Sequence, residues 1–462
     1  MSKKENQKLE PPVAPKGMHD LLAKEYYYYQ GFYEKAAEIG TYYGFKPIET
    51  PLLEETRLYT SGVGETTDIV EKEMYEIKSK TGSTPLALRP EGTAGVVRAY
   101  IENGMQTMPQ PVMLYYYGTF YRHDKPQKGR LRELRQFGFE ILGSEKSIAD
   151  ATIIKVTMTA LEEAGHKNLQ LSINSIGDKA CRNSYKKELT NYYKKHASAS
   201  CKDCKIRIKN NPLRLLDCKD AKCQTIKEGA PQSVSYLCEA CKQHFKEVLE
   251  YLEALKIEYT IDSKLVRGLD YYTRTVFEIS LKPTPKPVEE KKEGPKPEGE
   301  ETPVDETDKI PKIIETLPLA LAGGGRYDYL AKTLGHKKDL PGVGVGIGVD
   351  RVIVAEGFNQ ELAPRILKKP KIYFIQLGFS AKLQSLAIIE ILRKARIPVM
   401  QSLSKDSLSS QLSTAEKLKI PYTIIMGQKE VIDGTVIVRN MDTRSQDEIK
   451  VEKLTEYVKK MK

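Results

Sequence analysis

The stretch LYYYGTFYRHDKPQKGRLRELRQFGFEILG, residues 114–143, decides the fold predicted for this chain. It predicts two strands joined by a basic loop. Because successive side chains of a strand point to opposite faces, Gln136, Gly138 and Glu140 share one face of the second strand, and the apolar residues between them share the other. A glycine inside a strand often marks the close approach of another group. The polar face therefore predicts a site for a small polar ligand, with a solvent-facing edge strand as the alternative.

Two other stretches carry polar residues next to predicted elements. RPEGTAG places Glu91 and Thr93 in a turn shaped by glycine and proline, ahead of a predicted helix. LVRGLDYYTRTVFEI places Arg267, Tyr271 and Tyr272 directly before an apolar strand. Both stretches are therefore candidate site elements.

Glycine clusters follow in AGGGRYDYL and PGVGVGIGVDRVI. The alternate glycines at 342, 344, 346 and 348 would leave one face of a strand without side chains, so that another backbone or a flat ligand could lie against it. Neither cluster is a GxGxxG turn, and the sequence contains neither a P-loop motif nor HExxH. Arginines and magnesium would therefore have to hold the phosphates of a bound nucleotide.

The charge of the chain indicates an anionic partner. The 462 residues suggest about three domains. With 73 Lys and Arg against 62 Asp and Glu, the net charge is +11, which favours a partner such as nucleic acid. Residues 178–255 carry 16 basic and 10 acidic residues, and residues 371–462 carry the same numbers. This segregation predicts contact with a long polyanion at two places, a solvated Lys-rich surface being the alternative.

The sequence predicts a cytoplasmic protein. Its first residues lack the apolar core of a secretory signal. No apolar run approaches the ~18 residues that a membrane span needs. The seven cysteines, an odd number, argue against a disulfide-stapled secreted chain.

Two segments differ from the rest in composition. Residues 282–311 are almost entirely Pro, Glu, Lys, Asp, Gly and Thr, which cannot bury enough apolar surface to offset the entropy of ordering, so a disordered insertion is predicted. After a break near 359–371, strands and helices alternate to the end of the chain. That alternation predicts a compact α/β domain with a mainly parallel sheet.

In this order, the blocks resemble the histidyl-tRNA synthetases, a family of class II aminoacyl-tRNA synthetases. PIETPLLEETRLYTSGVGETTDIVEKEMYEI resembles the first class II motif, with Pro51 as its signature proline. YRHDKPQKGR and RQFGFE resemble the second motif, and GVGVGIGVDR resembles the third. RGLDYYTRTVFE and GGGRYD resemble the two histidine-specific signatures. The likeness implies an α+β catalytic core, built on a class II antiparallel sheet flanked by helices, with a helical insertion domain and a C-terminal α/β anticodon-binding domain.

The resemblance divides the chain into five parts. They are the first part of the catalytic core (1–177), the helical insertion domain (178–255), the second part of the core with the disordered insertion and third motif (256–358), a linker (359–370) and the anticodon-binding domain (371–462).

The resemblance also implies the activity of a histidine–tRNA ligase. Histidine and ATP, with Mg²⁺, would give histidyl-adenylate, and the histidyl group would pass to the 3′ end of tRNA(His). The first motif implies a homodimer. Residues implied for ATP are Arg122, Asp124, Leu134, Arg267, Asp350 and Arg351, with Arg122 and Arg267 as catalytic arginines at the α-phosphate. Residues implied for histidine are Glu91, Thr93, Gln136, Glu140, Tyr271, Tyr272 and Tyr327, and those for tRNA are Lys125, Gln127 and Lys128.

The chain departs from the family pattern at three positions. Asp124 and Asp350 stand where the motifs usually have Glu, and Leu134 stands where the family usually has a Phe that stacks on adenine. The aromatic contact is worth roughly 1 kcal/mol, so its loss predicts weaker ATP binding than in relatives that carry Phe.

Two CxxC pairs, Cys201 with Cys204 and Cys238 with Cys241, are separated by 33 residues. Such pairs can hold a tetrahedral zinc ion, so these four cysteines predict a structural zinc site, with reduced structural thiols as the alternative. Cys181 is expected to be an ordinary core cysteine.

Three other functions fit parts of the pattern. A synthetase-like regulatory subunit of the first enzyme of histidine biosynthesis usually lacks the anticodon domain and loses the catalytic arginines, which are all present here. A class II synthetase for another amino acid is disfavoured by RGLDYY. A nucleic-acid-binding scaffold would keep the fold without the chemistry. Histidine-dependent ATP–pyrophosphate exchange separates these functions from the ligase.

Overall fold

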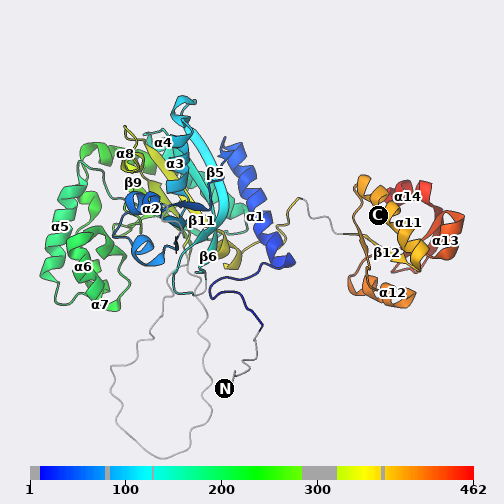
Figure 1. The fold of residues 1–462 in the computed structure, drawn as a ribbon. Helices are drawn as coiled ribbons and strands as arrows, with labels where there is room; N and C mark the ends of the chain where they lie inside the picture. The colour runs from blue at the N-terminus through cyan, green and yellow to red at the C-terminus, as the bar shows by residue number, and fades with distance from the viewer. Residues whose placement is uncertain (1–10, 79–83, 127–128, 283–319, 366–369, 462) are drawn as a thin grey trace, which may run out of the picture. The chain divides into compact units, whose positions relative to one another are not determined.

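The computed structural model describes residues 11–78, 84–126, 129–282, 320–365 and 370–461. They form two compact units, one ending at Pro364 and one beginning at Arg365 (Figure 1). The five-part division predicted from the sequence remains a prediction. The insertion predicted for 282–311 lies outside the described residues from position 283 onward.

An eight-stranded sheet forms the centre of the first unit, with the strand order β1-β5-β6-β11-β10-β9-β7-β8. Neighbouring strands are antiparallel except at the two edges, where β1–β5 and β7–β8 are parallel. The strands are β1 (Lys46–Pro47), β5 (Val112–Tyr121), β6 (Glu133–Leu142), β7 (Leu169–Ser175), β8 (Tyr259–Ile261), β9 (Thr273–Leu281), β10 (Ala320–Arg326) and β11 (Gly342–Gly348). The predicted antiparallel sheet flanked by helices is therefore confirmed, with a mixed edge on each side.

One face of this sheet carries the larger hydrophobic core. Its helices are α1 (Ala23–Tyr42), α4 (Ser147–Glu163), α8 (Glu239–Ala254) and α10 (Val349–Val354). Phe137, Phe139 and Ile141 of β6 point into this core and are 0, 0 and 2 % exposed. The predicted division of β6 into an apolar and a polar face is confirmed. Although α8 lies within the predicted insertion domain, its apolar residues belong to this core.

The opposite face is covered by a second core. Its helices are α2 (Thr56–Val63), α3 (Thr93–Glu102) and α9 (Leu330–Thr333). A small antiparallel sheet, in the order β2 (Leu53–Glu55), β4 (Leu86–Leu88) and β3 (Glu76–Ile77), precedes α3 in the chain. Helices α5 (Arg182–Lys195), α6 (Lys202–Asn210) and α7 (Ala221–Glu228) form a separate group at one side of the unit (Figure 1). This group has a small core of its own.

The second unit has a five-stranded sheet in the order β13-β12-β14-β15-β16. Its strands are β12 (Ile372–Gln376), β13 (Val399–Gln401), β14 (Tyr422–Met426), β15 (Thr435–Asn440) and β16 (Gln446–Lys450), and its helices are α11 (Phe379–Lys394), α12 (Leu408–Lys417), α13 (Gln428–Asp433) and α14 (Leu454–Lys460).

The α/β character predicted for this unit is confirmed, but the expectation of a mainly parallel sheet is wrong. Only β12–β13 and β12–β14 are parallel, whereas β14–β15 and β15–β16 are antiparallel. Strand β16 was not predicted. It follows β15 after a short turn, and a connection of that length can join only antiparallel neighbours. No helix among the described residues of either unit is long and apolar enough to span a membrane.

Candidate active site

A cavity of about 280 Å³ lies over the polar face of β6. Eleven of the thirteen residues predicted to bind ATP or histidine line it. They are Glu91, Thr93, Arg122, Asp124, Leu134, Gln136, Arg267, Tyr271, Tyr272, Asp350 and Arg351. Segments that are far apart in the sequence thus meet at one place in the fold.

Glycines leave the space for this cavity. Gly346 of β11 pairs with Gly138 of β6, and a Cβ atom built on Gly346 would lie 3.9 Å from the nearest side chain. That is an ordinary contact with the amide group of Gln136, so the added atom would fit without a clash. A Cβ on Gly138 would overlap the ring of Tyr116, and one on Gly323 would overlap the guanidinium of Arg267. Because these glycines have no side chain, the ring of Tyr116 can lie against β6 and the guanidinium of Arg267 can lie against β10.

The carboxylate of Glu91 caps the N-terminus of α3. It accepts hydrogen bonds from the backbone N–H groups of Thr93 at 2.8 Å and Ala94 at 2.9 Å, and from the hydroxyl of Tyr271 at 3.2 Å. Burial raises the pKa of Glu91 in opposition to these bonds. A carboxylate offers about four acceptor positions, so Glu91 retains capacity for one more donor in the cavity.

Glu140 lies one layer below the cavity. Its side chain is completely buried, and its two oxygens lie 2.8 Å from the hydroxyl of Thr93 and 2.5 Å from that of Tyr327. Burial raises the pKa of Glu140 to about 8, so its carboxyl group holds a proton at neutral pH. Glu140 and Tyr327 are the two predicted residues that do not line the cavity. Thr93 connects both to the cavity wall.

Four arginines surround the other part of the cavity: Arg122, Arg130, Arg267 and Arg351. Two of them have carboxylate partners. Arg267 forms a salt bridge with Glu278 at 2.8 Å, and Arg130 forms one with Asp124 at 3.3 Å. The Nε atom of Arg267 is buried with no hydrogen-bond partner among the described residues.

The other two arginines are held by main-chain oxygens. Arg122 Nε donates to the carbonyl of Pro90 at 2.8 Å, and Arg351 donates to those of Gly129 and Ala320 at 2.9 and 3.0 Å. Within the part of the chain that the structure describes, neither forms a salt bridge. Burial, together with the neighbouring guanidinium groups, lowers the pKa of Arg351. Positive charge without a carboxylate partner is suited to a polyphosphate.

Both carboxylate oxygens of Asp350 are hydrogen-bonded to other groups of the protein. Asp350 accepts hydrogen bonds from the hydroxyl of Tyr29 at 2.9 Å and from the backbone N–H of Arg135 at 2.6 Å. Burial raises the pKa of Asp350. The carboxylate therefore ties α1 to β6 at the cavity edge.

Of the three residues predicted to approach tRNA, only Lys125 is described. It is exposed in the loop between β5 and β6, and its backbone N–H donates to the carboxylate of Asp124 at 2.6 Å. Gln127 and Lys128 lie outside the described residues.

Among the cavity residues that were not predicted from the sequence as ligand contacts are Tyr116, Arg130 and Glu278, which have polar side chains. The signal for Glu278 was available, because it is the one acidic residue in an otherwise largely apolar strand, TRTVFEISL. Tyr116 lies in a run of three tyrosines, which gave no indication of which one faces the cavity.

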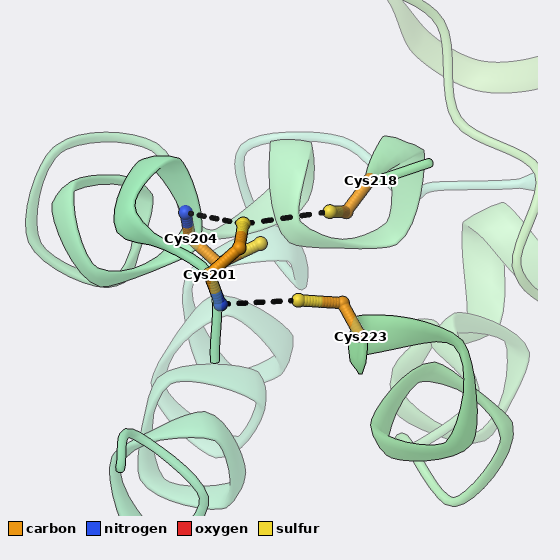
Figure 2. A group of neighbouring side chains, drawn as sticks. All are labelled: Cys201, Cys204, Cys218 and Cys223. Atoms are coloured by element: carbon orange, nitrogen blue, oxygen red, sulfur yellow. Dashed lines mark hydrogen bonds between the residues drawn. The ribbon is translucent and has the colours of Figure 1, made fainter. Parts of the chain in front are cut away.

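The four cysteines predicted to share one zinc site lie in two different clusters. The first cluster is Cys201, Cys204, Cys218 and Cys223 (Figure 2). The second is Asp178, Cys181, Cys238 and Cys241. The predicted grouping is therefore not the observed one, and Cys181, expected to be an ordinary core cysteine, belongs to the second cluster. The two CxxC pairs begin separate helices, α6 and α8, so each pair meets different neighbours.

Comparison with solved structures defines the class of protein. The crystal structure of apo histidyl-tRNA synthetase from S. aureus is 29% identical in sequence, has a TM-score of 0.74, and covers 97% of this chain and 100% of its own. The fold is that of a class II aminoacyl-tRNA synthetase.

Comparison of sequences identifies the family within this class of protein. The histidyl-tRNA synthetase model matches residues 17–290, and the anticodon binding domain model matches residues 371–461. Histidine–tRNA ligases of Desulforamulus reducens and Acetivibrio thermocellus are 37% and 39% identical over 96% of this chain, and over 98% and 99% of their own. The chain belongs to the histidyl-tRNA synthetase family.

Proposed function

We propose that the cavity over β6 is where this chain, acting as a histidine–tRNA ligase, joins histidine to the AMP part of ATP with release of pyrophosphate. The histidyl group then passes to tRNA(His) with release of AMP. One observation carries the assignment to this cavity. An arginine cluster and a buried group of carboxyls and hydroxyls meet there, one suited to phosphates and the other to an ammonium group and an imidazole.

The arginine side would bind ATP. Negative charge builds on the α-phosphoryl oxygens during attack by the histidine carboxylate, and guanidinium groups already in position stabilise it. Arg122 and Arg267 would take this role, since Pro90 and Glu278 hold them in place. Arg351, Asp124 and Leu134 would contact the rest of the nucleotide, and Asp350 would hold β6 in place at the edge of this site. Mg²⁺ prefers oxygen ligands and usually binds together with phosphates. The carboxylates of Asp124 and Glu278 face the cavity and would hold it.

The carboxyl side would bind histidine. Glu91, with Thr93 and Gln136, would receive the α-ammonium group, because Glu91 keeps acceptor capacity in a buried setting. Glu140, Tyr271, Tyr272 and Tyr327 would select the imidazole. The imidazole has one N–H donor and one lone pair. An amino acid that lacks these groups would leave buried polar groups of the site unpaired, so the site should reject it by a factor of roughly 10⁴–10⁵.

The partner of the reaction is tRNA, in keeping with the anticodon binding domain at 371–461. Lys125, Gln127 and Lys128 would approach its acceptor end.

We also propose a homodimer built on the first motif. Leu52, Leu53 and Ile77 in and beside the small sheet are 43, 40 and 40 % exposed, which is apolar surface suited to a second copy. A cytoplasmic location is proposed because all seven cysteines are free.

Histidine-dependent ATP–pyrophosphate exchange tests the function. We expect the full chain to exchange pyrophosphate with histidine and not with the other amino acids, and then to charge tRNA(His). Arg267→Ala should lower the exchange rate by roughly 10²–10³, whereas Arg57→Ala, at a side chain 81 % exposed, should leave it unchanged. Absence of exchange by the wild type would favour a regulatory subunit or a scaffold. Exchange with a different amino acid would overturn the substrate assignment.

A further inference from the structure

We propose that Cys201, Cys204, Cys218 and Cys223 bind one structural zinc ion. This cluster lies in the group formed by α6, the turn Pro212–Asp217 and α7, and none of its residues lines the catalytic cavity. The site therefore adds to the proposed function and does not depend on it.

The sulfur positions suit a tetrahedral metal. All four sulfur atoms lie within 4.8 Å of one another, and those of Cys201 and Cys218 are 3.8 Å apart. With a Zn–S distance of about 2.3 Å, neighbouring sulfurs of a tetrahedral site lie about 3.8 Å apart. A disulfide would require about 2.05 Å, and all four cysteines are free. The spacing therefore matches metal-bound thiolates and not a disulfide.

The backbone around the cluster is arranged to stabilise thiolates. The N–H of Cys201 donates to the sulfur of Cys223 at 3.3 Å, and the N–H of Cys204 donates to that of Cys201 at 3.4 Å. Figure 2 shows both bonds and the contact between Cys201 and Cys218. Hydrogen bonds to the ligand atoms fix their orientation and favour the deprotonated form that binds metal.

The sequence supplies charge that would offset the ion's ligands. Four thiolates around Zn²⁺ leave a net charge of about −2. Four exposed lysines lie next to the cysteines (Lys202, Lys205, Lys219 and Lys222) and outnumber the three neighbouring aspartates (Asp203, Asp217 and Asp220), so these segments carry a net positive charge of +1. The spacing C-x₂-C-x₁₃-C-x₄-C lies within the pattern of zinc modules.

The short helices around this cluster would also be stabilised by a bound metal ion. Helix α6 has nine residues and α7 has eight, whereas isolated helices shorter than ~12 residues are marginal in water. The core of the group is small, and Cys204, Cys218 and Cys223 are themselves part of it. A metal ion would add a cross-link between helices whose shared core is small.

The second cluster is a weaker candidate because its carboxylate is already engaged. Asp178 accepts a hydrogen bond from the N–H of Ala180 at 2.9 Å and forms a salt bridge with Arg274 at 3.3 Å. A metal ion there would compete with Arg274 and with the N–H of Ala180 for the oxygens of Asp178. Its cysteines therefore provide the matched control.

The test is metal analysis of the full chain, purified without chelators and without added zinc. We expect about one zinc per chain in the wild type and in Cys238→Ser, and a loss of at least ninefold in Cys218→Ser and Cys223→Ser. Cobalt(II) added to metal-free wild type should give the intense visible absorption of a tetrahedral thiolate site, and Cys218→Ser should not. The cobalt spectrum keeps the test informative if a serine variant is poorly folded.

Three results would overturn the assignment. They are well under one zinc per chain in the wild type together with no cobalt spectrum, equal loss of zinc in Cys238→Ser and Cys218→Ser, and fewer than seven free thiols in the denatured, metal-free chain kept under argon. Because none of these readouts uses aminoacylation, a failure of the zinc site is distinguishable from a failure of the proposed function.

Discussion

The hydroxyl of Tyr327 and the carboxyl group of Glu140 lie 2.5 Å apart in the interior, although 187 positions separate them in the sequence. The other oxygen of Glu140 lies 2.8 Å from the hydroxyl of Thr93, which lines the cavity. Tyr327 thus fixes the direction in which a completely buried carboxyl group presents its second oxygen. The selection of an imidazole would depend on this orientation.

Tyr327→Phe tests that orientation. Without the hydroxyl, one oxygen of the buried Glu140 carboxyl group loses its hydrogen-bond partner, which costs about 1–3 kcal/mol. We expect the KM for histidine in pyrophosphate exchange to rise roughly 10- to 100-fold, with the KM for ATP unchanged. Tyr259→Phe removes an exposed hydrogen bond to Glu253 and should change neither constant. An equal rise in both KM values would mean that Tyr327 acts on the whole cavity.

The raised pKa of Glu140 predicts a pH-dependent stability. Between the ordinary carboxyl pKa near 4.5 and the folded value of about 8, the folded chain holds a proton that the unfolded chain has lost. The contribution of Glu140 to stability is therefore complete below pH 4.5 and is lost as the pH rises towards 8.

Urea unfolding of the wild type and of Glu140→Gln at pH 5.5 and pH 8 measures this effect. The free energy of unfolding of the wild type should fall relative to the variant by up to about 1.4 kcal/mol per pH unit. The same difference at both pH values would show that Glu140 titrates normally.

Two glycine substitutions distinguish the effect of displacing an arginine from the effect of filling part of the cavity. A Cβ on Gly323 would overlap the guanidinium of Arg267, so Gly323→Ala should displace Arg267 and lower the exchange rate at saturating substrates by roughly 10²-fold. A Cβ on Gly346 would meet only the amide group of Gln136, at the ordinary contact distance of 3.9 Å, and would clash with no protein group. Gly346→Ala should therefore leave thermal unfolding unchanged and mainly raise the KM values. A loss of stability in Gly346→Ala would contradict the absence of a clash at that position.

Leu134→Phe tests the departure from the family pattern. Leu134 lines the cavity, and a phenyl ring there could stack on adenine, which adds roughly 1 kcal/mol beyond burial. The KM for ATP should fall about fivefold, and the KM for histidine should stay the same. An unchanged or higher KM for ATP would place adenine elsewhere.

A buried ion pair supports the segment that carries Tyr327. Arg326 donates to Asp150 at 2.6 Å, and both side chains are completely buried. Burial opposes ionisation of Asp150, but the guanidinium of Arg326 and the hydrogen bond from His244 hold its pKa below the usual range. Its contribution to stability is therefore present above the ordinary Asp pKa and is lost as the pH falls through the lower, folded value.

Asp150→Asn should destabilise the first unit by about 3–5 kcal/mol, because the buried guanidinium of Arg326 loses a charged partner. The matched control is Glu55→Gln, which removes the exposed partner of Arg57 and should cost less than about 1 kcal/mol. Denaturant unfolding at pH 7 measures both. Similar values for the two variants would mean that Asp328, the other partner of Arg326, is sufficient.

The sequence by itself determined the features that follow from short-range periodicity and spacing. The alternation in RQFGFE predicted which side of β6 faces the core, because neighbouring side chains of a strand point in opposite directions whatever lies around them. The resemblance of its motif blocks to those of the histidyl-tRNA synthetases implied which residues would gather around one cavity. Strand β16 and the antiparallel half of the second sheet were not predicted. The direction of a strand depends on which strands it pairs with, and a local sequence pattern does not identify those partners.

Only the tertiary structure decided how distant segments meet. Cys201 and Cys204 meet Cys218 and Cys223 and not the second CxxC pair, because α7 folds back onto the start of α6 while α8 packs into the main core. Glu140 was predicted to contact the ligand directly, yet it lies below the cavity and reaches it through Thr93. Depth below a surface and the choice between similar partners are set by packing in three dimensions, which spacing along the chain does not encode.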